Sequence, residues 1–159
     1  TNSWTSASGG LTKHFYAYER SSNTGKICSS GTYCTDTVER TTTWTGKVGL
    51  MYPSDYGYAT SGGSTTDRTT CLNINITSWS SYSECYNNDW LFNSSSSQWT
   101  ISPFATSSNA SYAFRVYYYG RVNNGYASSN YGVRPVVYLT SNVGIQSGDG
   151  SMGNPFILS

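Results

Sequence analysis

Apolar residues in this chain of 159 residues occur only in short runs, and no segment keeps the 3.6-residue period of a long helix. Short runs bounded by Gly, Pro, Ser and Asn are typical of β-strands joined by turns and loops. We therefore expect an α+β domain with many short strands, long loops and one or two short helices. The expected strands are residues 13–20, 48–52, 113–122, 133–139 and 156–158. Residues 90–92 and 99–101 are two further short apolar pieces, separated by a serine-rich turn.

The composition limits the kinds of partner that the chain can have. Aromatic residues make up 16% of it, which argues against disorder of the whole chain. Charged residues make up only 11% and the net charge is +1, so we expect no nucleic-acid partner and no attraction to anionic lipid. We expect no direct membrane insertion, because no apolar run approaches the length of a membrane-spanning helix. Thr1 opens a polar stretch, and we expect any secretion signal or anchor to lie outside this sequence.

Four cysteines indicate disulfides and an oxidising compartment. They allow three pairings, between which the sequence does not decide. Proximity in the sequence favours Cys28–Cys34 and Cys71–Cys85, each of which would close a polar loop. A zinc site is the alternative, but its usual ligand spacing is missing and His14 is the only histidine. We expect the long polar stretch of residues 60–98 to fold back on itself and to be held by its cysteines and tryptophans.

The segment of residues 113–139 is expected to form a hairpin followed by a core strand. In its first part, successive side chains should point to opposite faces of a strand, so that Phe114, Val116 and Val122 point inward. "NNG" at residues 123–125 is a strong signal for the hairpin turn, and "VRPVVYL" at 133–139 is the most apolar strand. The outward side chains have the chemistry of a binding surface, because Tyr gives large contact area while Asn and Ser adapt their hydrogen bonds. The predicted ligand-binding patch is Tyr117, Tyr119, Arg121, Asn123, Asn124, Tyr126, Ser128, Asn130 and Tyr131.

A plain structural role is the alternative for these tyrosines, which would then only cover a small sheet with their hydroxyl groups in water. Arg134 has a different expected role. It enters an apolar strand between Val133 and Pro135, so we expect a partly buried, structural arginine paired with a carboxylate or with backbone carbonyls. Asp55 is a plausible partner for it.

Residues suited to catalysis or to metal binding are scarce. His14 is the only histidine and is expected at the surface or at a sheet edge, and no hydrolase, phosphate-binding or zinc-protease motif occurs. Calcium needs clustered oxygen ligands, whereas the acidic residues after residue 40 are isolated. "SGDGS" at residues 147–151 is more typical of a tight turn than of a calcium loop. We therefore expect no enzyme activity, no cofactor and no metal.

Four segments together resemble a bacterial family of surface and prepilin-type proteins: "WTGKVGLMYPSDYGYA", "CLN…W…C…NDWLF…QWTISP", "FRVYYYGRV" and "YGVRPVVYLTSNVGIQSGDGSMGNPFIL". The resemblance covers residues 44–159 of an expected single domain, while residues 1–43 are a loop-rich part without a match. It implies a C-type-lectin-like fold of the formylglycine-generating-enzyme branch, with residues 133–139 in the core and residues 117–131 at the rim. The variable proteins of diversity-generating retroelements have a similar fold. Formylglycine-generating enzymes use a late cysteine pair, and this chain has no cysteine after Cys85, so that activity is not expected.

Two functions of different kinds follow from these features. The first is a non-enzymatic, extracellular display domain, as in an adhesin or a pilus tip, that binds a protein or glycan ligand through its Tyr-rich patch. The alternative is the structural head of a type IV pilin-like filament subunit, whose exposed aromatic residues contact neighbouring filament subunits.

Overall fold

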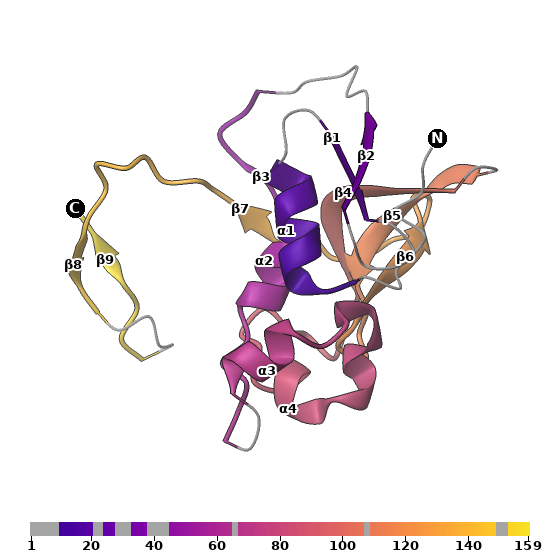
Figure 1. Ribbon diagram of the computed structural model, residues 1–159. Helices are drawn as coiled ribbons and strands as arrows, with labels where there is room; N and C mark the ends of the chain where they lie inside the picture. The colour runs from indigo at the N-terminus through magenta and orange to yellow at the C-terminus, as the bar shows by residue number, and fades with distance from the viewer. Residues whose placement is uncertain are drawn as a thin grey trace.

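The computed structural model describes residues 10–20, 24–27, 33–37, 45–64, 67–106, 109–148 and 153–159. This part of the chain is mixed α/β, with several antiparallel sheets and a few short helices (Figure 1). The helices are α1 (Thr12–Arg20), α2 (Pro53–Tyr58), α3 (Arg68–Leu72), the 3₁₀ helix η2 (Ile76–Ser81) and α4 (Ser83–Tyr86). The strands are β1 (Thr24–Ile27), β2 (Tyr33–Thr37), β3 (Gly49–Leu50), β4 (Gln98–Thr106), β5 (Asn109–Val116), β6 (Val122–Tyr126), β7 (Pro135–Val136), β8 (Ile145–Ser147) and β9 (Ile157–Leu158).

Helix α1 replaces the strand that we expected over residues 13–20, and this prediction was wrong. Thr12, Phe15 and Glu19 are buried, and their spacing of three and four residues is that of one helix face. The phenyl ring of Phe15 packs edge-on against that of Phe114 in β5, with ring centroids 5.3 Å apart. His14 therefore lies on a helix and not at a sheet edge. The helix covers the inner face of the sheet that contains β5.

Helix α2 follows β3 directly. Of the strand expected over residues 48–52, only Gly49–Leu50 pairs with another strand, and Pro53 begins the helix. The buried carboxylate of Glu19 accepts a hydrogen bond from the backbone N–H of Ser54 at 3.2 Å and another from its hydroxyl group. An anion at this end satisfies backbone N–H groups that have no partner inside the helix. Glu19 thus joins α1 to the start of α2.

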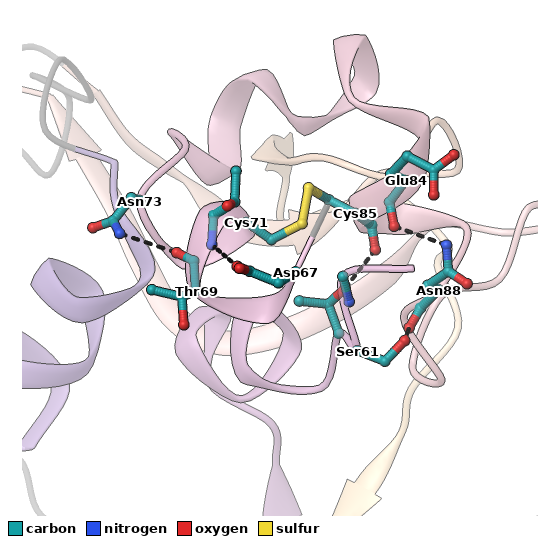
Figure 2. Close-up of a disulfide and its surroundings, with 12 residues drawn as sticks. Ser61, Asp67, Thr69, Cys71, Asn73, Glu84, Cys85 and Asn88 are labelled. Carbon is teal, nitrogen blue, oxygen red and sulfur yellow. Dashed lines mark hydrogen bonds between the residues drawn. A yellow bond between two sulfur atoms is a disulfide. The ribbon is translucent and has the colours of Figure 1, made fainter. Parts of the chain in front are cut away.

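The long polar stretch after α2 folds back on itself, as we expected, and it does so through the short helices α3, η2 and α4, which we did not predict. A disulfide joins Cys71 of α3 to Cys85 of α4, with their Cα atoms 5.6 Å apart and neither residue exposed (Figure 2). The hydroxyl group of Thr60 donates to the carbonyl oxygen of Cys85 at 2.7 Å. The disulfide confirms the predicted Cys71–Cys85 pairing. Cys28 lies outside the described residues, so Cys28–Cys34 stays a prediction.

Strands β4, β5 and β6 form an antiparallel sheet that carries the core on one face. Phe114, Val116 and Val122 are buried there, which confirms the predicted inward set. The phenyl ring of Phe104 packs on that of Phe114 at 5.1 Å. Within the expected apolar segment of residues 90–92, Leu91 is buried but Trp90 is 73% exposed. The inner face of the sheet packs against α1 through the contact of Phe114 with Phe15, and the opposite face carries other side chains.

Residues 133–139 do not form the expected core strand, and this prediction was wrong. Only Pro135–Val136 pairs with β3, and of these two only Val136 packs against the core. After Val136 the chain leaves the body, and the β8–β9 hairpin lies apart from it (Figure 1, yellow). We call residues 137–148 and 153–159 the C-terminal arm. Its exposed apolar side chains are Val137, Tyr138, Leu139, Ile145, Phe156, Ile157 and Leu158.

Candidate ligand-binding site

The turn between β5 and β6 lies at Tyr118–Gly120, and not at Asn123–Gly125 as the sequence suggested. The backbone N–H of Gly120 donates to the carbonyl oxygen of Tyr117 at 2.7 Å. The backbone N–H of Tyr117 donates to the carbonyl oxygen of Arg121, also at 2.7 Å. Gly120 has φ +84°, a value that glycine adopts readily and other residues rarely. Asn123–Gly125 instead lies within β6 and pairs with β5. The positive φ is thus required five residues earlier than the "NNG" signal indicated.

Gly120 also fixes the turn to the rest of the domain. The hydroxyl group of Tyr56 in α2 donates to the carbonyl oxygen of Gly120 at 3.0 Å. Burial raises the pKa of Tyr56 well above its usual value, so this hydroxyl group stays protonated. A Cβ atom added at Gly120 would lie 2.3 Å from the ring of Tyr86 in α4. The turn is therefore held through its backbone, from two different helices.

Three consecutive tyrosines project from this anchored turn. The ring centroids of Tyr117 and Tyr118 are 4.2 Å apart, and those of Tyr118 and Tyr119 are 4.3 Å apart. The hydroxyl group of Tyr117 donates to that of Tyr118 at 3.0 Å. This hydrogen bond, and then one with Tyr119, raises the pKa of Tyr118 above its usual value. Tyr118 is 37% exposed and Tyr119 57%.

Aromatic and arginine side chains stack in a row on the outer face of the sheet. The guanidinium group of Arg115 lies 4.5 Å from the ring centroids of both Tyr117 and Tyr131, and its Nε donates to Oδ1 of Asn123 at 2.9 Å. The ring of Tyr131 packs in turn on that of Trp99 at 4.7 Å. Cation–π contacts of this kind stabilise by about 0.5–2 kcal/mol each. The row holds the side chains of this face in one arrangement.

Gly125 makes room for this row. A Cβ atom at this position would lie 2.9 Å from the ring of Tyr131 and 3.0 Å from the side chain of Arg115. The backbone groups of Gly132 bond to the carbonyl oxygen of Ser97 and the N–H of Trp99, both at 2.9 Å, and so place Tyr131 beside Trp99. We define the tyrosine face as this row together with the turn: Trp99, Arg115, Tyr117, Tyr118, Tyr119, Arg121, Asn123 and Tyr131.

A cavity of about 470 Å³ adjoins the tyrosine face at the turn. Tyr118, Tyr119 and Arg121 are among the residues that line it. Tyr86 and Phe92 line it as well, and their rings meet edge-on with centroids 5.2 Å apart. The remaining lining side chains are those of Ser80, Asn87 and Ser94. The cavity is thus lined by aromatic rings, neutral hydrogen-bonding groups and one arginine.

Arg134 is half-buried and belongs to a separate polar network. Its Nε donates to Oε1 of buried Gln98 at 3.0 Å, so Gln98, and not Asp55, accepts this hydrogen bond. The Asp55 carboxylate accepts from the backbone N–H of Tyr52 at 2.7 Å. Arg134 also acts electrostatically on buried Asp89, whose pKa rises to about 8 because burial outweighs this attraction. Arg134 is thus partly buried, as we expected, but this hydrogen bond goes to a side-chain amide and not to the carboxylate or backbone carbonyl that we expected.

The predicted patch is divided between two faces of the hairpin. Tyr117, Tyr119, Arg121, Asn123 and Tyr131 belong to the tyrosine face, whereas the other four members of the patch do not. Asn124 pairs with Phe114 on the inner face, and Tyr126 stacks on Tyr112 at 4.4 Å near the other end of the strands. Ser128 and Asn130 lie after the end of β6, and both are exposed. The division follows from the position of the turn.

Some residues of the site were not predicted. Alternation along β5 could have identified Arg115, because it lies on the same face as Tyr117. Tyr86 and Phe92 gave no such signal, because they reach the site through the folding of the disulfide-linked segment. Within the described ranges, no group of three or more His, Cys, Asp or Glu side chains could hold a metal ion. No helix of this part of the chain is long and apolar enough to cross a membrane.

Comparisons with known proteins identify no relative. No protein-family model matches the chain, and neither the curated proteins nor the solved structures include a significant match.

Proposed function

We propose that this chain is a non-enzymatic, extracellular binding domain that uses the tyrosine face to contact a protein or glycan ligand. The observation that carries the proposal is the anchored turn. Its backbone is fixed by Tyr56 and Tyr86, while Tyr118 and Tyr119 remain exposed at its tip. Tyrosines held in a fixed arrangement lose little conformational entropy when they bind a partner.

The chemistry of the face also suits recognition. Neutral phenol groups and arginine side chains offer ring faces and hydrogen-bond donors, and Tyr and Arg are enriched among the residues that dominate binding energy. The buried Cys71–Cys85 disulfide is consistent with an extracellular location. We further propose a C-type-lectin-like fold. Its support is the pairing of β7 with β3, the antiparallel β4–β6 sheet and the long segment between α2 and β4.

Replacement of the exposed tyrosines tests the proposal. We expect the double substitution Tyr118→Ser and Tyr119→Ser to reduce ligand binding at least tenfold and to leave the thermal unfolding midpoint nearly unchanged. Tyr126→Ser is the matched control, because Tyr126 is 55% exposed, like Tyr119, but lies outside the tyrosine face. Binding is measured on arrays of glycans and of extracellular protein domains. Equal loss of binding in the control and the double variant would contradict the proposal, as would unfolding of the double variant.

The filament subunit is the second candidate function, and a different observation favours it. The C-terminal arm exposes apolar side chains on a two-stranded hairpin, and an isolated hairpin is only marginally stable in water. Contact with a neighbouring subunit would bury these side chains. The two functions use different surfaces, because the arm contributes no residue to the tyrosine face.

A further inference from the structure

Arg121 is the one charged residue that lines the cavity beside the turn. The Nε atom of this side chain is buried and has no hydrogen-bond acceptor among the residues that the structure describes. The other lining residues are tyrosines, a phenylalanine, serines and an asparagine, so the lining holds no carboxylate. A buried donor without an acceptor destabilises the free protein. An anionic ligand in the cavity would instead pair with the terminal N–H groups of the same guanidinium group.

Arginine is well suited to one kind of anion. Its planar guanidinium group presents paired N–H donors that match the two oxygens of a carboxylate. The nearest aromatic contact of this group is with the ring of Tyr117, at 5.8 Å from the ring centroid. This ring lies beside the guanidinium group without neutralising its charge.

The rest of the lining indicates what carries the carboxylate. The lining includes the aromatic rings of Tyr86, Phe92, Tyr118 and Tyr119, and the C–H groups of a saturated ring can stack on aromatic rings. Ser80, Asn87 and Ser94 supply neutral groups that can hydrogen-bond to hydroxyls. The volume of about 470 Å³ lies within the range of about 300–1,000 Å³ that is usual for small-molecule sites. A sugar ring has both the C–H faces and the hydroxyl groups that this lining matches.

We propose that the cavity binds a carboxylate-bearing sugar, such as a hexuronate residue of an acidic glycan, with its carboxylate paired to Arg121. This inference rests on the proposed function, since it names the class of ligand that the turn and its surroundings would recognise. Tyr118 and Tyr119 belong both to the tyrosine face and to the cavity, so a glycan seated in the cavity would also contact the face.

Calorimetric or NMR titration with two matched sugars tests the inference. Methyl β-glucuronide carries the carboxylate, and methyl β-glucoside has a neutral hydroxymethyl group in its place. We expect the unsubstituted protein to bind the glucuronide at least tenfold more tightly than the glucoside. Arg121→Gln should reduce this ratio to about one, whereas Arg121→Lys should keep part of it. Arg68→Gln is the control for the loss of one positive charge, because Arg68 does not line the cavity.

Three results would overturn the inference. The first is that the unsubstituted protein shows no preference for the glucuronide, which includes binding neither sugar. The second is that the preference survives in Arg121→Gln. The third is that benzoate, an aromatic carboxylate, binds as tightly as the glucuronide. In each case the proposed function is judged separately, by the comparison of the Tyr118/Tyr119 double variant with Tyr126→Ser.

Discussion

Burial strongly perturbs the carboxyl group of Asp89. It is 5% exposed, and its Oδ1 accepts from the backbone N–H of Leu91 at 2.9 Å, whereas its Oδ2 has no partner among the described residues. Burial raises its pKa from 3.8 to about 8, against the lowering effects of the Leu91 hydrogen bond and of Arg134. The folded protein therefore holds this carboxyl group protonated at neutral pH.

The pH dependence of stability follows from this pKa. A group whose pKa is higher in the folded than in the unfolded state favours folding fully at low pH, and this contribution is lost as pH rises. We expect Asp89 to lower the free energy of unfolding between about pH 4 and pH 8, with a slope of up to about 1.4 kcal/mol per pH unit. Asp89→Asn should remove this slope and be more stable than the parent at pH 8. Urea unfolding at several pH values measures it, and parallel pH profiles of the two proteins would contradict the assignment.

Among the structural elements, the β5–β6 hairpin depends most on a single position. Gly120→Ala would place a methyl group against the ring of Tyr86 at a positive φ, so we expect a loss of about 2–4 kcal/mol in the free energy of unfolding. Gly49→Ala is the control, because no atom lies within 4 Å of its added Cβ. Denaturant midpoints compare the two variants. An unchanged midpoint for Gly120→Ala would mean that the turn is not anchored at Tyr86.

The same hairpin shows which features of an element its own sequence predicts and which depend on the rest of the fold. Alternation correctly predicted that Phe114, Val116 and Val122 face the core, because a strand's period is a local property. The turn was misplaced because two glycines compete for it, and the choice depends on the fit of Gly120 against Tyr86, a residue of another element. Similarly, α1 was predicted as a strand because its aromatic residues suit either structure, and the helical period is seen only in the burial of Thr12, Phe15 and Glu19.

At the scale of the whole molecule, the C-terminal arm separates the two candidate functions. If the chain is a filament subunit, we expect self-association at high protein concentration that Leu139→Ser and Phe156→Ser together abolish, because exposed apolar groups favour burial between chains. Analytical ultracentrifugation measures it, with Tyr126→Ser as the control. A monomer at every concentration would count against the filament subunit and leave the display domain unaffected.

The segment that leads into the arm also shows why the whole fold could not be predicted from runs of apolar residues. The apolar run at residues 133–139 indicated a buried strand, yet Val133 and Tyr138 are 62% and 68% exposed. An apolar run indicates that a segment tends to be buried. It does not indicate whether the segment is buried within its own chain or against another chain. By contrast, proximity in the sequence favoured the Cys71–Cys85 pairing that the structure shows, because the two residues close a loop within one continuous segment.

The attachment of the hairpin turn has a consequence for protein engineering. Position 120 is held by a main-chain carbonyl and by the lack of a side chain, so the identities of residues 118 and 119 contribute little to holding the loop in place. A library that randomises these two codons while glycine is kept after them should yield mostly folded proteins. Natural variation at these codons would meet the same tolerance, so new specificities could arise there without compensating changes elsewhere.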